Sequence, residues 1–151
     1  ALNGLALSHG RQHLGNHIIV EHKVPHCTSS QLFKSVLREK SSGVFNGRTI
    51  VQKNAQKTDA NQTNKNLLLS KDALMNSNPQ LEIHADDVRC THGSTTGELD
   101  ADSLFYLRSR GLDLAMAKSL LVRGFATECF DTVKNEKVRS FIIKRFDNWL
   151  N

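Results

Sequence analysis

The spacing of apolar residues changes near residue 98, and this change divides the chain into two regions. In the first region, apolar residues come in short runs separated by Asn, Ser, Thr, Gln and Gly, which is typical of strands joined by polar turns. Asn46-Gly47 and Asn78-Pro79 are turn signals. The runs expected to form strands are His17–Val20, Gln31–Phe33, Gly43–Phe45, Arg48–Val51, Asn66–Leu69 and Leu81–Ala85.

Amphipathic patterns of helix length do not separate these runs, except at Ser30–Arg38, which also fits a short helix. The first region therefore indicates a β-sandwich, a barrel or a β-solenoid. Recurrent Asn residues favour the solenoid, because Asn side chains stack in ladders where strands repeat in register. The repeat is too irregular to decide between solenoid and sandwich. This interpretation places in turns Asn46, Asn54, Asn61, Asn64, Asn66, Asn76 and Asn78.

The second region has a helical period. Asp100 and Asp113 are suited to cap the starts of two helices, Gly111 to end the first, and Asn135 to begin a third. The apolar residues expected to share a face are Leu104, Phe105 and Leu107 in the first helix, Ala117, Leu121, Phe125 and Cys129 in the second, and Val138, Phe141, Ile142, Phe146 and Trp149 in the third.

These patterns predict a β domain over residues 1–98 and a helical domain over residues 99–151. The apolar faces of the helices can pack on one another and cover the β domain. Part of the same surface can instead receive a partner protein. The two interpretations are compatible, and the residue pattern favours the first.

Charge and cysteine content exclude several classes of protein. The net charge is +5, and residues 1–80 carry ten Lys and Arg against four Asp and Glu. These positive charges are scattered singly, which argues against a nucleic-acid surface. No apolar run approaches the roughly 18–20 residues that span a bilayer, so we expect no membrane partner. Three widely spaced cysteines, Cys27, Cys90 and Cys129, form no disulfide framework and indicate a reducing compartment.

The densest polar stretch runs from Asp86 to Asp100 and contains Cys90 and His92. If residues 88–92 are extended, these two side chains share a face about 6.5–7 Å apart, within reach of one iron or another soft metal. A Cys-x-His pair alone is a weak signal, because a structural zinc site needs four ligands. The alternative is that Cys90 is a small buried hydrophobe and His92 a turn histidine, and the residue pattern alone favours it.

Enzyme chemistry is less well supported. The sequence contains no phosphate-binding glycine loop, no G-x-S-x-G elbow and no HExxH helix. His17, His22 and His26 suggest a cupin-like metal site, but the close His-x-His pair expected there is missing. A nucleophilic Cys90–His92 pair is disfavoured, because residues two apart on a strand rarely meet at hydrogen-bond distance.

Several long blocks, in the same order, resemble the SufB/SufD family of iron–sulfur cluster assembly proteins, and more closely its SufD branch. The resemblance covers about residues 13 to 130, nearly the whole chain. The blocks that carry it are Val24–Ser30, Gly43–Arg48, Ala55–Ala60, Gln62–Ser70, Pro79–Asp100 and Leu104–Gly111.

The resemblance implies a right-handed parallel β-helix followed by a small C-terminal helical domain, in a scaffold protein rather than an enzyme. The family's Cys-x-His falls on Cys90 and His92. His92 is thereby implied as the ligand of a transient iron–sulfur cluster shared with a SufB-like subunit, and Cys90 as a secondary ligand. Asp86, Asp87 and Glu98 are weaker candidates for shaping the site. A purely structural subunit without a cluster ligand is the alternative.

The resemblance also implies partners and a compartment. A SufB-like subunit would pair with the β-helix, and a SufC-like ATPase would bind the helices. The compartment would be the bacterial cytoplasm or a plastid-type organelle. The chain would be the C-terminal part of such a protein, beginning inside the β-helix, and its exposed end would invite self-association. The helical residues expected to bind the ATPase are Leu104, Phe105, Tyr106, Arg108, Arg110, Leu121 and Phe125.

Overall fold

The structure is a computed structural model that describes residues 1–150. The chain divides into two compact units, Ala1–Thr96 and a second unit that begins at Gly97. Every strand lies in the first unit except for the last residue of the final strand, and the helices lie in the second. No helix among residues 1–150 combines the length and the apolar character needed to cross a membrane.

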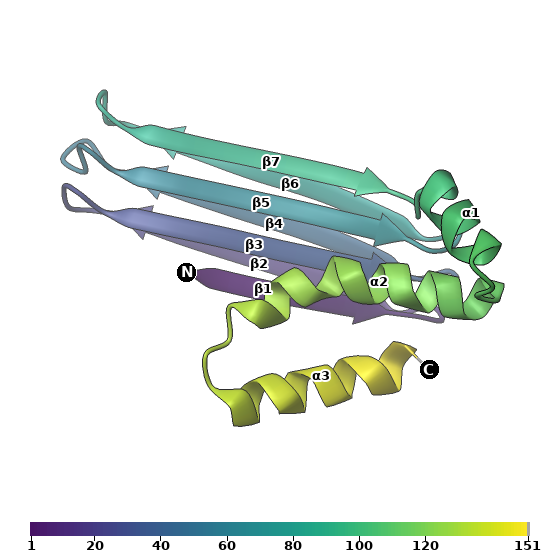
Figure 1. Cartoon of the computed structure of the whole chain (residues 1–151). Coiled ribbons are helices and arrows are strands. Elements are labelled where there is room, and N and C mark those ends of the chain that lie inside the picture. The colour runs from purple at the N-terminus through teal and green to yellow at the C-terminus, as the bar shows by residue number, and fades with distance from the viewer. Residues whose placement is uncertain (151) are drawn as a thin grey trace. The chain divides into compact units, whose positions relative to one another are not determined.

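The first unit is a parallel β-solenoid of about three turns, in which successive strands alternate between two sheets (Figure 1). One sheet has the order β1-β3-β5-β7 and the other the order β2-β4-β6. This arrangement confirms the solenoid and excludes the sandwich. The strands are β1 Leu2–Ser8, β2 His13–His22, β3 Thr28–Leu37, β4 Ser42–Val51, β5 Asp59–Leu68, β6 Leu74–Ile83 and β7 Arg89–Gly97.

Each turn of the solenoid takes about thirty residues, but the number varies. Leu2 pairs with Gln31, 29 residues later, whereas Ser42 pairs with Leu74, 32 residues later. The loops between the strands differ in length, whereas the strands themselves stay in parallel register. The variable period explains why the sequence showed no regular repeat.

Side chains alternate between the interior and the outer surface along each strand. In β4 the inward positions Gly43, Phe45, Thr49 and Val51 are all buried. The ring of Phe45 lies 5.4 Å, centroid to centroid, from that of Phe33 on β3, a strand of the other sheet. Apolar side chains that meet in this way between the two sheets form the core at this level of the solenoid.

Another part of the interior is polar, and this corrects the prediction that Asn marks the turns. Of the seven Asn residues placed in turns, only Asn54 lies in one, and the other six lie in strands. Asn46 does pair with Asn78, as a ladder requires. Asn64 and Asn66 point inward and are buried.

The helix that Ser30–Arg38 could have formed is absent, because residues 30–37 belong to strand β3. Inward residues of this segment include Gln31, which is 1% exposed, and Phe33. Both faces of this strand are covered at its end, where residues 34–37 are all buried. The β2, β4 and β5 strands also extend beyond the short apolar runs predicted for them.

The second unit contains α1 Ala101–Ser109, α2 Leu114–Asp131 and α3 Glu136–Leu150. The predicted caps are confirmed. Asp100 accepts a hydrogen bond from the Ser103 backbone N–H at 2.7 Å, and Asp113 accepts one from Met116 N–H at 2.8 Å. Asn135 begins α3 in the same way. Gly111 follows α1 with a φ of 95°, the left-handed conformation that ends many helices.

The buried face of α2 differs from the predicted stripe. Ala117 and Cys129 are buried, but Leu121 and Phe125 are only half-buried. A spacing of four residues drifts by about 40° per step around a helix, so a stripe built on it leaves the buried face. The buried residues of α2 are Ala117, Val122, Ala126, Cys129 and Phe130.

In α3 the predicted apolar face is covered only in part. Phe146 is buried, and its ring lies 5.4 Å from that of Phe130, centroid to centroid. Val138 and Phe141 are exposed. The third helix therefore packs on the second through one end of its apolar face.

Candidate functional site

Strand β7 is the last strand of its sheet and pairs on one side only, with β5 (Figure 1). In the other sheet β6 is likewise the last strand. Among residues 1–150 no strand continues either sheet beyond this point, so one edge of β7 has no strand paired with it. The inward side chains of β7 therefore form the last level of the solenoid interior.

Hydrogen bonds to β5 define which side chains of β7 face inward. Thr91 lies on the outer surface, where its Oγ1 accepts from Nδ2 of the exposed Asn61 at 2.7 Å. Ser94 lies on the inner face, where it donates to Oδ1 of the buried Asn64 at 3.4 Å. Because alternate side chains of a strand share a face, Cys90 and His92 lie on the inner face with Ser94.

Cys90 is half-buried and packs against a small apolar cluster of Val51, Ala55 and Ala85. Burial raises the pKa of its thiol. The nearby Asp59 carboxylate raises this pKa further, whereas a backbone hydrogen bond from Ala60 lowers it. The thiol is thus protonated at neutral pH, and it becomes a metal ligand only when a cation displaces its proton.

His92 is exposed, and its ring makes no hydrogen bond or ion pair with any part of the chain that the structure describes. Both ring nitrogens are therefore accessible to a ligand from outside the chain. No three His, Cys, Asp or Glu side chains among residues 1–150 lie close enough together to hold a metal ion. Cys90 and His92 can supply at most part of a metal site.

The three carboxylates predicted to shape the site do not gather around His92. Asp86 and Asp87 lie in the turn before β7, where Asp87 forms an ion pair with Lys57. Glu98 follows the far end of the same strand. A nine-residue strand separates the two ends by about 30 Å.

The histidines of the cupin-like alternative point in different directions. His17 lies on the outer face of β2 and hydrogen-bonds to Asn46 at 3.3 Å. His22 is buried, and its Nε2 lies 3.0 Å from Oγ of Ser29. His26 lies in the following turn with a φ of 60°. These three side chains form no common site.

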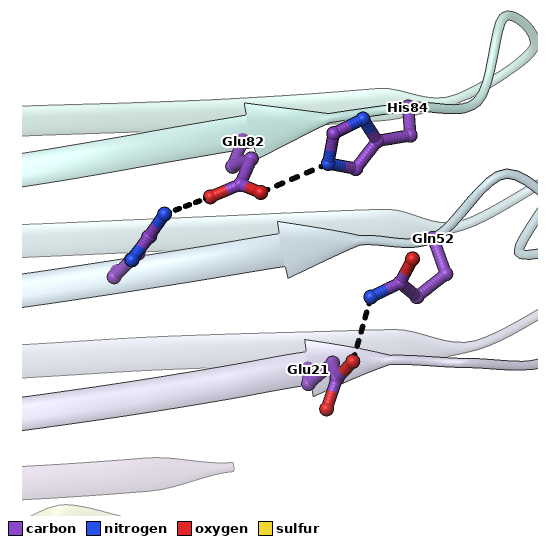
Figure 2. Close-up of polar contacts among 5 residues, drawn as sticks. Glu21, Gln52, Glu82 and His84 are labelled. Carbon is purple, nitrogen blue, oxygen red and sulfur yellow. Dashed lines mark hydrogen bonds and ion pairs between the residues drawn. The ribbon is translucent and has the colours of Figure 1, made fainter.

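A polar ladder on the outer face of the three-stranded sheet was not foreseen from the sequence. Nε2 of His84 lies 2.9 Å from Oε1 of Glu82, and the two side chains point toward one another in Figure 2. Glu82 also pairs with Arg48. One turn away, Gln52 donates to Glu21 at 2.7 Å. The hydrogen bond from His84, and then that from Arg48, lower the pKa of Glu82. Each acid in this ladder already has a partner within the sheet. The ladder therefore leaves no carboxylate free to bind a ligand.

Residues 1–125 match the family model described as "SUF system FeS cluster assembly, SufBD core domain". The chain belongs to this SufBD family.

Among its relatives is the iron–sulfur cluster assembly protein SufD of Escherichia coli, 38% identical over 144 residues, which are 95% of this chain and 34% of the relative. A SufBD family protein of Synechocystis is 43% identical over 129 residues, 85% of this chain and 28% of the relative. The chloroplastic protein ABCI7 of Arabidopsis thaliana is 39% identical over 127 residues, 83% of this chain and 26% of the relative. The chain thus spans about a third or less of the length of these proteins.

The helical unit of this SufBD chain exposes some of the residues predicted to bind an ATPase and covers others. Phe105 is 75% exposed and Tyr106 is 56% exposed. The Arg110 guanidinium lies 5.2 Å from the centroid of the Tyr106 ring. Arg108 is also exposed. The half-buried members of the set are Leu104, Leu121 and Phe125.

Two hollows flank α2 in this unit. One, of about 460 Å³, is lined mainly by residues of α1 and α2, including Tyr106, Leu107 and Leu120. The other, of about 480 Å³, is lined by Met116, Leu120 and further residues of the second and third helices. The helical unit therefore offers exposed aromatic side chains beside concave apolar surface, which protein interfaces commonly use.

Proposed function

We propose that this chain is the C-terminal part of a SufD-like scaffold subunit that supports the assembly of iron–sulfur clusters. In this proposal the final solenoid turn meets a SufB-like subunit, and His92 supplies one ligand to a cluster formed between the two proteins. The observation that carries the proposal is the position of His92, exposed and without a hydrogen bond on the inner face of an open final strand.

The donor chemistry suits a shared and transient site. Imidazole and thiolate both bind iron, and the cluster is cargo that the assembly builds and releases. Cys90 is the secondary ligand, because its raised thiol pKa opposes the thiolate form that binds metal. Half a site binds weakly by itself, so in this proposal the cluster forms only together with the partner, and the chain acts as a scaffold.

The helical unit is proposed to dock a SufC-like ATPase through Phe105, Tyr106 and their neighbours. Their exposure and the adjoining hollow support this role. Nucleotide-driven movement of the ATPase would then reach the cluster site through rigid elements of the scaffold. As a compartment we propose the bacterial cytoplasm or a plastid-type organelle, in line with a bacterial and a chloroplastic relative.

The test compares the wild-type full-length protein with His92→Ala. Each is reconstituted without oxygen together with its SufB-like and SufC-like partners, and iron content and visible absorption are measured. His84→Ala is the matched control, since it removes another exposed histidine from the outer face of the solenoid. We expect His92→Ala to lose the cluster while the complex still assembles, and His84→Ala to keep it.

A purely structural subunit is the second candidate, and the shielded thiol of Cys90 favours it. It predicts that His92→Ala leaves the cluster yield unchanged. That result would show that His92 is not a ligand of the cluster.

A further inference from the structure

The interior below His92 contains a chain of buried polar side chains. Gln31 and Gln62 are each 1% exposed, and so is Thr49. Nε2 of Gln31 donates to Oγ1 of Thr49 at 3.0 Å. Nε2 of Gln62 donates to Oε1 of Gln31 at 3.2 Å and approaches Oγ1 of Thr49 at 3.5 Å. The donor side of the Gln62 amide is therefore fully used within the solenoid.

The acceptor side of the same amide is not used. Oε1 of Gln62 is buried and has no hydrogen-bond partner among residues 1–150. Leaving a buried acceptor unsatisfied costs about 1–3 kcal/mol, so its retention calls for an explanation. The position is also held tightly, because a Cβ on Gly47 would lie 2.7 Å from Nε2 of Gln62.

The strand register brings this acceptor next to His92. Side-chain hydrogen bonds between β5 and β7 join residues thirty positions apart, as between Asn64 and Ser94. The same offset places His92 beside Gln62 on the inner face. Neighbouring strands are about 4.8 Å apart, so rotation of the exposed imidazole brings a ring N–H within reach of Oε1.

We propose that Gln62 is the positioning residue for His92: its free Oε1 accepts a hydrogen bond from one imidazole nitrogen and thereby turns the other nitrogen toward the metal. The role of this hydrogen bond in metal binding rests on the proposed function, whereas the hydrogen bond itself does not. Histidine ligands commonly donate their second N–H to an oxygen acceptor, which fixes the tautomer and the ring orientation. Gln62 acts through His92 and does not touch the metal.

The competing explanation is that Gln62 serves only the interior hydrogen-bond chain. Gln31→Met separates the two explanations, because it removes an equally buried amide from the same hydrogen-bond chain, on β3, one turn further from β7 than Gln62. Gln62 keeps Thr49 as an acceptor in that variant. A merely structural role predicts the same behaviour from both substitutions.

The experiment measures the tautomer of His92 by ¹⁵N NMR in the full-length protein with labelled histidine, and assigns the signal by its loss in His92→Ala. In the wild type we expect one tautomer to dominate. Gln62→Met should give the mixture of tautomers seen in free histidine, whereas Gln31→Met should keep the wild-type ratio. In the reconstituted complex, Gln62→Met should weaken iron binding about 10- to 100-fold.

Several outcomes would overturn the inference. A wild-type His92 with a free-histidine mixture of tautomers rejects it without any variant, even if Gln62→Met fails to fold. A Gln62→Met protein that keeps the wild-type ratio rejects it as well. If the tautomer shifts as expected but His92→Ala leaves the cluster intact, the hydrogen bond stands and the proposed function fails. The two ideas are therefore tested separately.

Discussion

The Asn64 side chain makes four hydrogen bonds inside the solenoid, and its replacement by Leu tests whether the polar interior stabilises the fold. The residue is 0% exposed. Its Nδ2 donates to the Phe33 carbonyl at 3.1 Å, and its Oδ1 accepts from Asn66, Ser77 and Ser94. A leucine of similar size removes all of these hydrogen bonds.

The expected cost follows from which partners are left without an alternative. Asn66 keeps Thr96 as an acceptor, and Ser94 keeps Ser77. Two interactions are lost outright, those made to the Phe33 carbonyl and by the Ser77 hydroxyl, at about 1–3 kcal/mol each. Burying Leu returns about 2 kcal/mol. We expect Asn64→Leu to lower the free energy of unfolding by about 2 kcal/mol.

Urea unfolding followed by far-UV circular dichroism measures this change. With a slope of about 2 kcal/mol/M, the midpoint should fall by about 1 M. Asn61→Leu is the control on the outer face of the same strand, and its free energy of unfolding should change by less than about 0.5 kcal/mol. An unchanged or raised midpoint in Asn64→Leu would refute the reasoning. It would mean that the cost of desolvating the buried polar groups is as large as the stabilisation from their hydrogen bonds.

Two further predictions concern titratable groups of the solenoid. Burial lowers the pKa of His22 below its ordinary 6.5, so as the pH falls below 6.5 the unfolded chain binds a proton that the folded chain resists. The urea midpoint should therefore fall between pH 7.5 and 5.5, and less so in His22→Gln; equal slopes would contradict this. Burial raises the thiol pKa of Cys90, so at pH 7.5 iodoacetamide should react more slowly with Cys90 than with the free thiol of glutathione. Once urea unfolds the chain, the two thiols should react at similar rates. Fast alkylation of Cys90 in the folded protein would show that its thiol is not shielded.

Local signals of the sequence predicted the helical unit better than the solenoid. Asp100 and Asp113 cap helices because a short acceptor side chain pairs with nearby N–H groups, and this depends only on adjacent residues. The buried face of α2 depends on what packs against it, so the stripe of Leu121 and Phe125 was predicted wrongly. The pattern of residues could not decide between sandwich and solenoid.

Sequence analysis usually assigns polar residues to turns and to the surface, and this assignment fails where the interior itself is polar. Gln62, Asn64 and Asn66 are buried because the parallel register stacks them on partners about thirty residues away. Nothing in a single strand reveals those partners. The same limit applies to the candidate site: extended geometry was enough to expect Cys90 and His92 on one face, but only the register reveals Gln62 beside His92.

A strand that is paired on one side only has a lower local stability than strands inside the stack. In a solenoid each turn is stabilised chiefly by its immediate neighbours, so β7, with β5 alone beside it, is expected to open more readily than β3 or β5. A partner that adds a neighbour to β7 would order the segment that carries His92. If His92 is a cluster ligand as proposed, departure of that partner would loosen this ligand at the moment when the partner's own ligands leave. Release of the cluster from such an edge would then follow from loss of the partner alone.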